Sequence, residues 1–207
     1  MDTPRRVSIS RAARLIALPL ALIVAARDTH AADLTFEVRG PSGLVADAVV
    51  YAEPLSGAAP PAANLRATID QVNKEFVPRV SVVRAGTQVS FPNSDNIRHS
   101  IYSFSPAKTF TTKLYSGREA APVLFDHSGL VVLGCNIHDK MVAWVLIVDS
   151  PWFAKSGADG IATLRELPPG EYRVTAAAPA AALKPQSVTV RVEAAPLRQT
   201  LTLGAGS

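Results

Sequence analysis

Short runs rich in β-branched and aromatic residues follow one another along residues 33–207, and turn-forming residues separate them. Gly86 and Pro92-Asn93 are examples of these separators. Such spacing is typical of β-strands joined by tight turns. Many short strands bury their apolar side chains by stacking into two sheets, so the sequence predicts an all-β fold of β-sandwiches. The runs lie at residues 34–38, 48–52, 80–84, 87–91, 123–125, 130–133, 142–148, 161–164 and 172–176.

One segment of this region, residues 69–76 with the sequence IDQVNKEF, fits either a helical turn or a strand. Pro78 follows it closely, and its neighbours on both sides have strand character. We therefore expect it to be strand.

Residues 1–32 have the pattern of a secretory signal peptide. Four arginines precede the apolar run 15–26, and the small residues Ala31 and Ala32 stand before Asp33. The alternative is a membrane anchor, but a spanning helix needs about 20 apolar residues, and Arg27 interrupts this run. We expect a cleaved signal, a periplasmic protein and no membrane span in the mature chain.

The charge balance changes when the signal is set aside. The whole chain has a net charge of +4, and residues 1–32 contain five arginines and two aspartates. The remaining residues carry 16 basic and 15 acidic side chains, a net charge of +1. This near-neutral balance argues against a nucleic-acid partner.

Two changes in composition suggest domain boundaries. Residues 55–64 are small and proline-rich, and the strand pattern breaks again after residue 148. The following segment, which places a Pro-Pro-Gly turn between runs 161–164 and 172–176, resembles the carboxypeptidase-regulatory or transthyretin-like β-sandwich. Residues 34–53 are similar to the opening hairpin of the same module. We expect a split module, residues 33–64 and 151–207, around a central domain of residues 65–150; the alternative is one continuous sandwich with decorations.

The scarcity of cysteine and methionine directs attention to one short loop. After the signal, the chain contains one cysteine, Cys135, one methionine, Met141, and three histidines. A single cysteine in an exported protein forms no internal disulfide, so a chemical use is favoured. Cys135, His138 and Met141 follow one another at intervals of three residues, and His99 lies in an upstream segment, FPNSDNIRHS.

These side chains are the ligand set of electron-transfer copper. Such sites hold copper with one thiolate, two imidazoles and a weak axial thioether. Cys135, His138 and Met141 can come from one tight loop between two strands, and His99 from a neighbouring strand. The sequence predicts one copper site formed by these four residues.

Other interpretations of these residues are weaker. Any one of them alone is more often a core or structural residue than a ligand. Zinc is disfavoured because structural zinc sites take four cysteine or histidine ligands. A thiol enzyme would need a group that orients the base, and no such group stands out beside Cys135 and His138.

On these residues the segment 69–148 resembles a cupredoxin. Its C-x2-H-x2-M loop is similar to that of the amicyanin type, and the wider block resembles plastocyanin-like proteins often labelled methylamine utilization proteins. The resemblance implies a cupredoxin-like Greek-key β-sandwich with His99 and His138 as equatorial ligands. It also implies Cys135 as the thiolate and Met141 as the axial ligand.

The chain departs from the cupredoxin pattern directly after the first histidine, where Ser100 replaces the usual asparagine. A serine can supply only part of the hydrogen bonding of that asparagine. Asn93, Asp95 and Asn136 are candidates for outer contacts around the ligands, although such residues also form turns. We expect His127, eight residues before Cys135, to be exposed and without a metal role.

Two functions are compatible with this sequence. A one-electron carrier would keep its copper and exchange electrons with a redox partner protein, a dehydrogenase or a cytochrome, near His138. A copper-binding or delivery protein would release its metal instead, and a decayed site is a third option. The sequence favours the carrier, because delivery proteins often use clusters of methionine and histidine. Enzymatic turnover is not expected, since four ligands leave no open position for a substrate.

Overall fold

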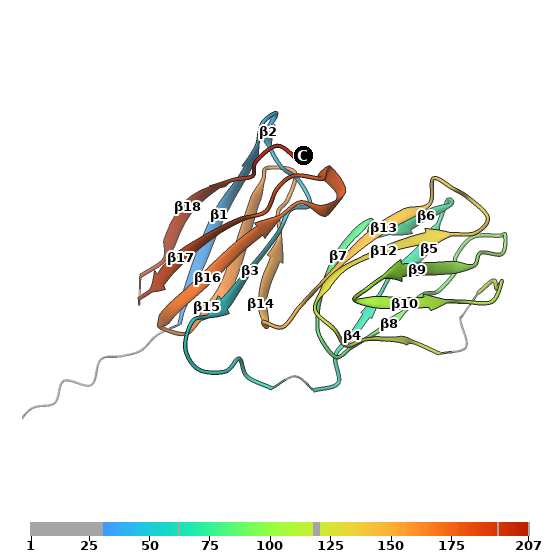
Figure 1. Cartoon of the computed structure of the whole chain (residues 1–207), viewed down its shortest axis with the longest axis horizontal. Coiled ribbons are helices and arrows are strands. Elements are labelled where there is room, and N and C mark those ends of the chain that lie inside the picture. Colours follow the sequence, from blue (N-terminus) through green and yellow to red (C-terminus); the bar gives the residue numbers. More distant parts are fainter. Residues whose placement is uncertain (1–30, 62, 118–120, 194, 207) are drawn as a thin grey trace, which may run out of the picture.

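A computed structural model describes residues 31–206 except 62, 118–120 and 194, and in these residues the chain is almost entirely β-structure (Figure 1). The all-β prediction is confirmed. The elements are β1 (Ala32–Gly40), β2 (Gly43–Leu44), β3 (Val49–Pro54), β4 (Arg66–Thr68), β5 (Asp70–Val72), β6 (Glu75–Val77), β7 (Val80–Arg84), β8 (Thr87–Ser90), β9 (Ile101–Ser105), β10 (Lys108–Thr111), β11 (Val123–Phe125), β12 (Gly129–Cys135), β13 (Val142–Val148), β14 (Trp152–Lys155), β15 (Ile161–Leu167), β16 (Gly170–Ala177), the 3-10 helix η1 (Pro179–Ala181), β17 (Gln186–Val192) and β18 (Leu197–Thr202).

The predicted signal peptide falls almost entirely outside the described residues, which begin at residue 31. Ala32, which the prediction placed in the signal, is the buried first residue of β1. Within the described part of the chain, no helix has the length and apolar character needed to cross a membrane.

The first sandwich combines strands from the two ends of the described chain. One sheet has the order β15-β1-β18, with β2 beside β1, and the other has the order β14-β3-β16-β17. Along β1, Leu34, Phe36 and Val38 point into the core, whereas Thr35 and Glu37 are half-buried on the opposite face. The core between the sheets includes Leu34, Phe36, Val38, Val50, Ala52, Leu164, Leu167, Val174, Val190 and Leu201.

The second sandwich is formed by the middle of the chain and lies beside the first (Figure 1). Its larger sheet has the order β10-β9-β12-β13-β7, and a sheet of order β11-β8-β4 and the hairpin β5-β6 accompany it. Strand β13 pairs antiparallel with β12 and parallel with β7. The core includes Ile69, Phe76, Phe91, Ile101, Phe125, Leu133, Cys135, Met141, Val145 and Ile147. The exact domain boundaries, after residues 64 and 150, stay a prediction.

Polar contacts join the two sandwiches. The Lys155 Nζ on β14 donates to the Val80 carbonyl on β7 at 2.7 Å and lies 2.7 Å from an Asp47 carboxylate oxygen. The Arg84 guanidinium donates to the Pro60 carbonyl, in the segment that leads from the first sandwich to the second. These contacts attach β7, the edge strand of the larger sheet, to the flanking module.

The strand predictions were confirmed for the runs richest in β-branched and aromatic residues. Each predicted run lies on a strand, and residues 69–76 form the hairpin β5-β6 rather than a helical turn. The strands β2, β4, β10, β14, β17 and β18 were not predicted; each lies at the edge of its sheet. Strand β9 was missed because its alternation is inverted: Ser103 is buried, whereas Phe104 is 80% exposed.

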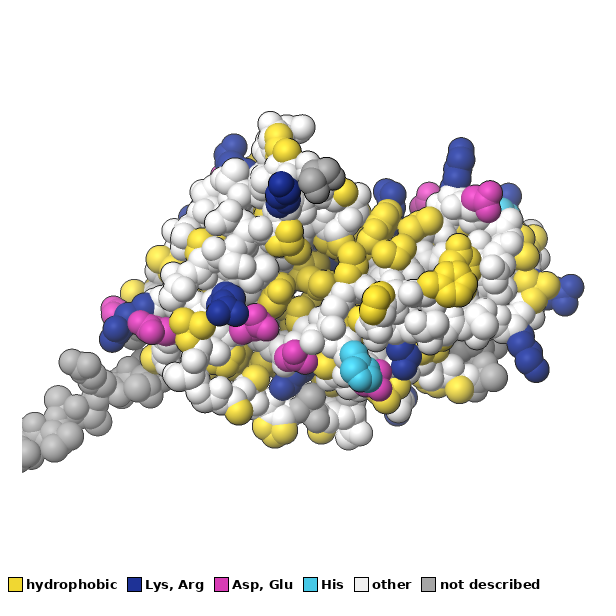
Figure 2. All heavy atoms as spheres, in the orientation of Figure 1, with side chains coloured by type: hydrophobic (Ala, Val, Ile, Leu, Met, Phe, Trp, Pro, Cys, Tyr) yellow, Lys and Arg dark blue, Asp and Glu magenta, His cyan; other side chains and the backbone are white. Residues whose placement is uncertain are grey.

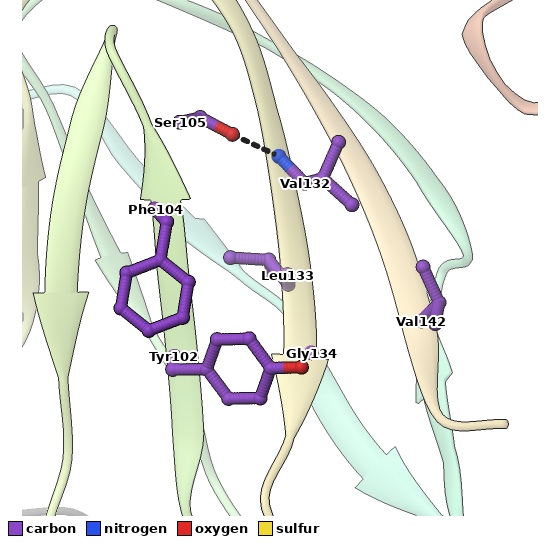
Figure 3. Close-up of a pocket in the computed structure, with 7 residues that line it drawn as sticks. All are labelled: Tyr102, Phe104, Ser105, Val132, Leu133, Gly134 and Val142. Carbon is purple, nitrogen blue, oxygen red and sulfur yellow. Dashed lines mark hydrogen bonds between the residues drawn. The ribbon is translucent and has the colours of Figure 1, made fainter. Parts of the chain in front are cut away.

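On the outer face of the larger sheet, the Tyr102 ring lies over the backbone of Gly134 (Figure 3). The two residues are partners in the β9–β12 register. A Cβ atom added to Gly134 would lie 2.5 Å from Tyr102 Cζ. Gly134 therefore allows the ring to cover the strand immediately before Cys135.

We predict that Gly134→Ala lowers the free energy of unfolding by about 1–3 kcal/mol, because either the ring or β12 must move. Denaturant unfolding measures the change. In a Tyr102→Ala background, Gly134→Ala should lower the free energy of unfolding by less. Val132→Ala, on the same strand, is the control, and its effect should be the same in both backgrounds. An equal cost of Gly134→Ala in both backgrounds would contradict the proposed contact.

Candidate metal centre

His99 and Cys135 reach the same end of the second sandwich through strand pairing. Cys135 is the last residue of β12 and registers with Ile101, the first residue of β9. His99 precedes β9 and is held by a bridge to Tyr115, in which each backbone N–H donates to the other's carbonyl at 2.9 Å. The backbone thus fixes both residues.

The loop of residues 136–141, between β12 and β13, brings His138 back to Cys135. The Asn136 backbone N–H donates to the Ser100 carbonyl at 3.0 Å, and the Asn136 side-chain amide donates to the Ser100 hydroxyl at 3.0 Å. At the far end of the loop, the Met141 N–H donates to the His138 carbonyl at 2.9 Å. The loop is therefore closed on itself and anchored to the segment that carries His99.

Three of the four predicted ligands meet at this point. The ligand atoms of His99, Cys135 and His138 all lie within 4.8 Å of one another. The Cys135 Sγ is 3.6 Å from the His99 Nδ1, and the two imidazole centroids are 5.3 Å apart. One thiol and two imidazoles converging in this way can coordinate one metal ion.

Met141, the fourth predicted ligand, is buried in the same core cluster as Cys135. It lies in the loop that carries His138 and directly precedes β13. Its place close to the cluster is compatible with an axial role, which stays a prediction. His138 differs from the other three because it is only partly buried.

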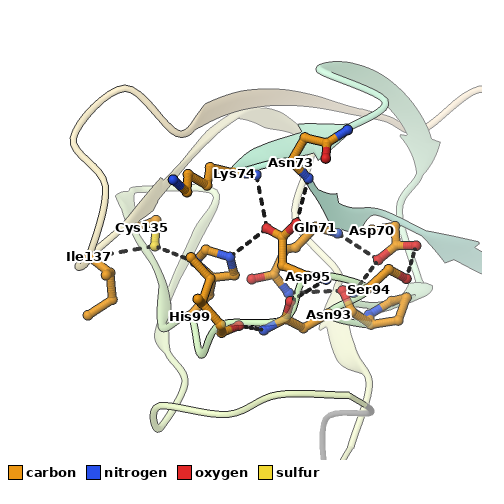
Figure 4. A network of polar contacts seen from close by, with 12 residues as sticks. Asp70, Gln71, Asn73, Lys74, Asn93, Ser94, Asp95, His99, Cys135 and Ile137 are labelled. Atoms are coloured by element: carbon orange, nitrogen blue, oxygen red, sulfur yellow. Dashed lines mark hydrogen bonds and ion pairs between the residues drawn. The ribbon is translucent and has the colours of Figure 1, made fainter.

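Asp95 lies beside one ring nitrogen of His99, and Cys135 lies beside the other. The Asp95 Oδ2 lies 2.8 Å from the His99 Nε2 (Figure 4). A carboxylate accepts a hydrogen bond, so Nε2 carries the hydrogen and the lone pair of Nδ1 points towards Cys135. Burial raises the pKa of Asp95, but hydrogen bonds from Lys74, His99 and Asn73 lower it by more, so that the pKa lies below its ordinary value.

The sulfur and the second imidazole also suit a bound cation. The Ile137 backbone N–H points at the Cys135 Sγ at a distance of 3.4 Å and donates towards the sulfur. The His138 Nδ1 is buried and has no hydrogen-bond partner among the described residues. A buried polar atom without a partner commonly marks an ion or water site, so the donor set fits a metal ion that prefers nitrogen and sulfur.

The candidates for outer contacts hold the ligand segments. The Asn93 side-chain amide donates to the Ile97 and Tyr115 carbonyls at 2.9 and 3.0 Å, and its Oδ1 accepts from the Asp95 N–H at 3.0 Å. Ser100 accepts from Asn136 and donates from its hydroxyl to the Thr112 carbonyl at 2.9 Å. The serine therefore supplies a loop-to-strand connection despite its departure from the expected asparagine.

Two features of the site were not predicted. Gln71 is fully buried and donates through Nε2 to the Tyr115 hydroxyl at 2.6 Å, below the segment that carries His99. The backbone amides of Asn73 and Lys74 donate to Asp95. The alternation in IDQVNKEF could have indicated a hairpin with a two-residue turn at Asn73 and Lys74. It could not have indicated that this turn binds the carboxylate of Asp95. His127, as predicted, is exposed: its side chain is 77% accessible and pairs with Asp126.

Comparisons with known proteins give structural likeness at low identity. No family model and no curated protein matches the chain. A copper-containing nitrite reductase from Thermus scotoductus SA-01 is similar over 46% of this chain and 25% of its own, with 24% identity and a TM-score of 0.38. A purple cupredoxin from Nitrosopumilus maritimus is similar over 41% of this chain and 99% of its own, with 20% identity and a TM-score of 0.35.

An oxidized amicyanin mutant is similar over 47% of this chain and 98% of its own, with 16% identity and a TM-score of 0.37. The chain thus spans about a quarter of the nitrite reductase and nearly the full length of the two smaller proteins. Since each TM-score is below 0.5, the functional proposal depends on the geometry of this chain.

We predict that Cys135→Ser and His138→Ala each weaken metal binding by at least about tenfold, because each removes a donor from the cluster. His127→Ala is the matched control: it removes an exposed imidazole outside the cluster and should leave the affinity unchanged. Isothermal titration with Cu(II), or with Co(II) as a spectroscopic probe, measures the affinities. Equal losses in the His127 and His138 variants would contradict the site.

Proposed function

We propose that this protein is a periplasmic cupredoxin with one type 1 copper, acting as a one-electron carrier. The observation that carries the proposal is the convergence of His99, Cys135 and His138, with the buried Nδ1 of His138 lacking a partner among the described residues. In the proposal these three residues hold the metal, and Met141 supplies the weak axial thioether. Copper, when bound, supplies a one-electron couple.

The residues around the cluster suit a carrier that retains its metal. The Asn136–Ser100 hydrogen bonds join the two ligand segments, and the His99–Tyr115 bonds hold the first of them to a neighbouring segment. A fixed donor set resists rearrangement when the metal changes oxidation state, which favours rapid electron exchange. Cys135 is buried at the end of β12, so its sulfur has little contact with water.

Electron exchange would take place where the cluster approaches the surface. His138 is the partly exposed ligand, and the neighbouring Ile137 is 50% exposed. Asp139 and Lys140, on the same loop, are also exposed. We infer that a redox partner protein, a dehydrogenase or a cytochrome, docks over this loop, with the apolar Ile137 against it and the charges at the rim.

The proposal also covers the predictions about export and the flanking module. Residues 1–32 would direct export to the periplasm and then be removed. The module of residues 33–64 and 151–207 would support the copper domain structurally, and it contacts β7 through the Lys155–Val80 and Arg84–Pro60 hydrogen bonds. A relation to methylamine utilization rests on the sequence resemblance.

We predict that the purified mature chain binds one Cu(II) and becomes intensely blue through thiolate-to-copper charge transfer. Reduction should bleach the colour reversibly, and transfer of copper to a chelator should be slow. Cys135→Ser should abolish the blue band, and His127→Ala should keep it. A visible spectrum with a redox titration measures both properties.

The outcomes separate the carrier from the other functions. A colourless protein whose Cys135 reacts fully with a thiol reagent in the presence of Cu(II) would overturn the proposal. A blue protein that loses copper rapidly to a chelator or to an acceptor protein would favour copper delivery.

A further inference from the structure

The Asp95 carboxylate lies between the buried ligand segment and a hairpin that the site does not otherwise use. Its Oδ1 accepts from the Asn73 backbone N–H at 2.5 Å, and its Oδ2 accepts from the Lys74 N–H at 2.9 Å. The same Oδ2 accepts from the His99 Nε2 at 2.8 Å. The carboxylate thus has three N–H donors, and Figure 4 shows it between His99 and the two amides.

The two amides come from a turn whose shape suits an anion. Asn73 and Lys74 connect β5 to β6, and both have positive φ values, 55° and 64°. Successive amides in a tight turn can point to the same side and bind a carboxylate. The Asp95 N–H is also held, by the Asn93 Oδ1 at 3.0 Å. The negative charge is therefore fixed in place and not free to swing into solvent.

We propose that Asp95 is a positioning residue that fixes the Nε2–H tautomer of His99 and lowers the reduction potential of the copper proposed for this site. The inference deepens the proposed function and rests on it for the potential. A carboxylate on the distal nitrogen makes the imidazole a stronger donor. A stronger donor next to a fixed negative charge stabilises Cu(II) more than Cu(I).

Asp70 offers a matched control for the charge. It lies on the same hairpin, and its described hydrogen bonds come from the Gln71 and Ser94 backbone amides and the Ser94 hydroxyl. Ser94 directly precedes Asp95 in the chain. Asp70→Asn therefore removes a charge of the same sign from the same part of the fold without changing the hydrogen bond to His99.

We predict that Asp95→Asn raises the midpoint potential of the blue protein, whereas Asp70→Asn changes it little. Loss of an outer partner of a metal-bound histidine typically changes affinity by about 10–100-fold. A tenfold loss of preference for Cu(II) over Cu(I) corresponds to a rise of about 59 mV. Asp95→Glu retains the charge, so its midpoint potential should stay close to that of the unmodified protein. Equal shifts in the Asp95 and Asp70 variants, or no shift in either, would overturn the inference.

A second measurement needs no metal and separates this inference from the proposed function. Long-range 1H–15N spectra of the metal-free protein should show His99 as the Nε2–H tautomer, with Nδ1 unprotonated. In Asp95→Ala the acceptor is lost, and the Nδ1–H tautomer should appear. Finding the Nδ1–H tautomer in the unmodified protein would overturn the role of Asp95, even if the protein proves to be a blue copper carrier. If the unmodified protein has the expected tautomer but forms no blue copper site, the proposed function and the effect on the potential are overturned. The role of Asp95 in fixing the tautomer then still holds.

Discussion

The pairing of β9 with β12 is the constraint on which the candidate site depends. His99 and Cys135 are 36 positions apart in the chain, and this pairing brings the His99 Nδ1 to within 3.6 Å of the Cys135 Sγ. Cys135 is the last residue of β12, His99 lies two residues before β9, and both side chains are buried. A shift of one residue in this register would turn the Cys135 side chain to the opposite face.

The rest of the site is an extension of that pairing. The Asn136–Ser100 bonds carry the register beyond the last ladder pair and orient the loop that holds His138. On the other side of His99, two backbone amides of the hairpin β5-β6 donate to Asp95, and Asp95 contacts His99. The hairpin therefore also supports this ligand. These contacts suit the proposed metal site, and the exposed loop around His138 is where the proposed redox partner would dock.

The sequence was most informative where a residue type that binds metal occurs only once, and where a run of apolar residues forms a buried strand. Cys135 and Met141 could be singled out because the sequence after residue 32 has one of each, and the runs in β1, β7 and β13 have the apolar content of buried strands. Strand β9 could not be predicted, because its serines face inwards and its aromatic residues face outwards. The role of Asp95 was also beyond prediction in detail, since its partners Asn73 and Lys74 meet it only after the chain has folded.

X-ray absorption at the copper edge tests the central claim most directly, since it reports the atoms bound to the metal. Protein loaded with one equivalent of Cu(II) should show one short copper–sulfur distance and two imidazole nitrogens, and the sulfur should disappear in Cys135→Ser. A spectrum of the unmodified protein with only nitrogen and oxygen neighbours would contradict a site built from His99, Cys135 and His138.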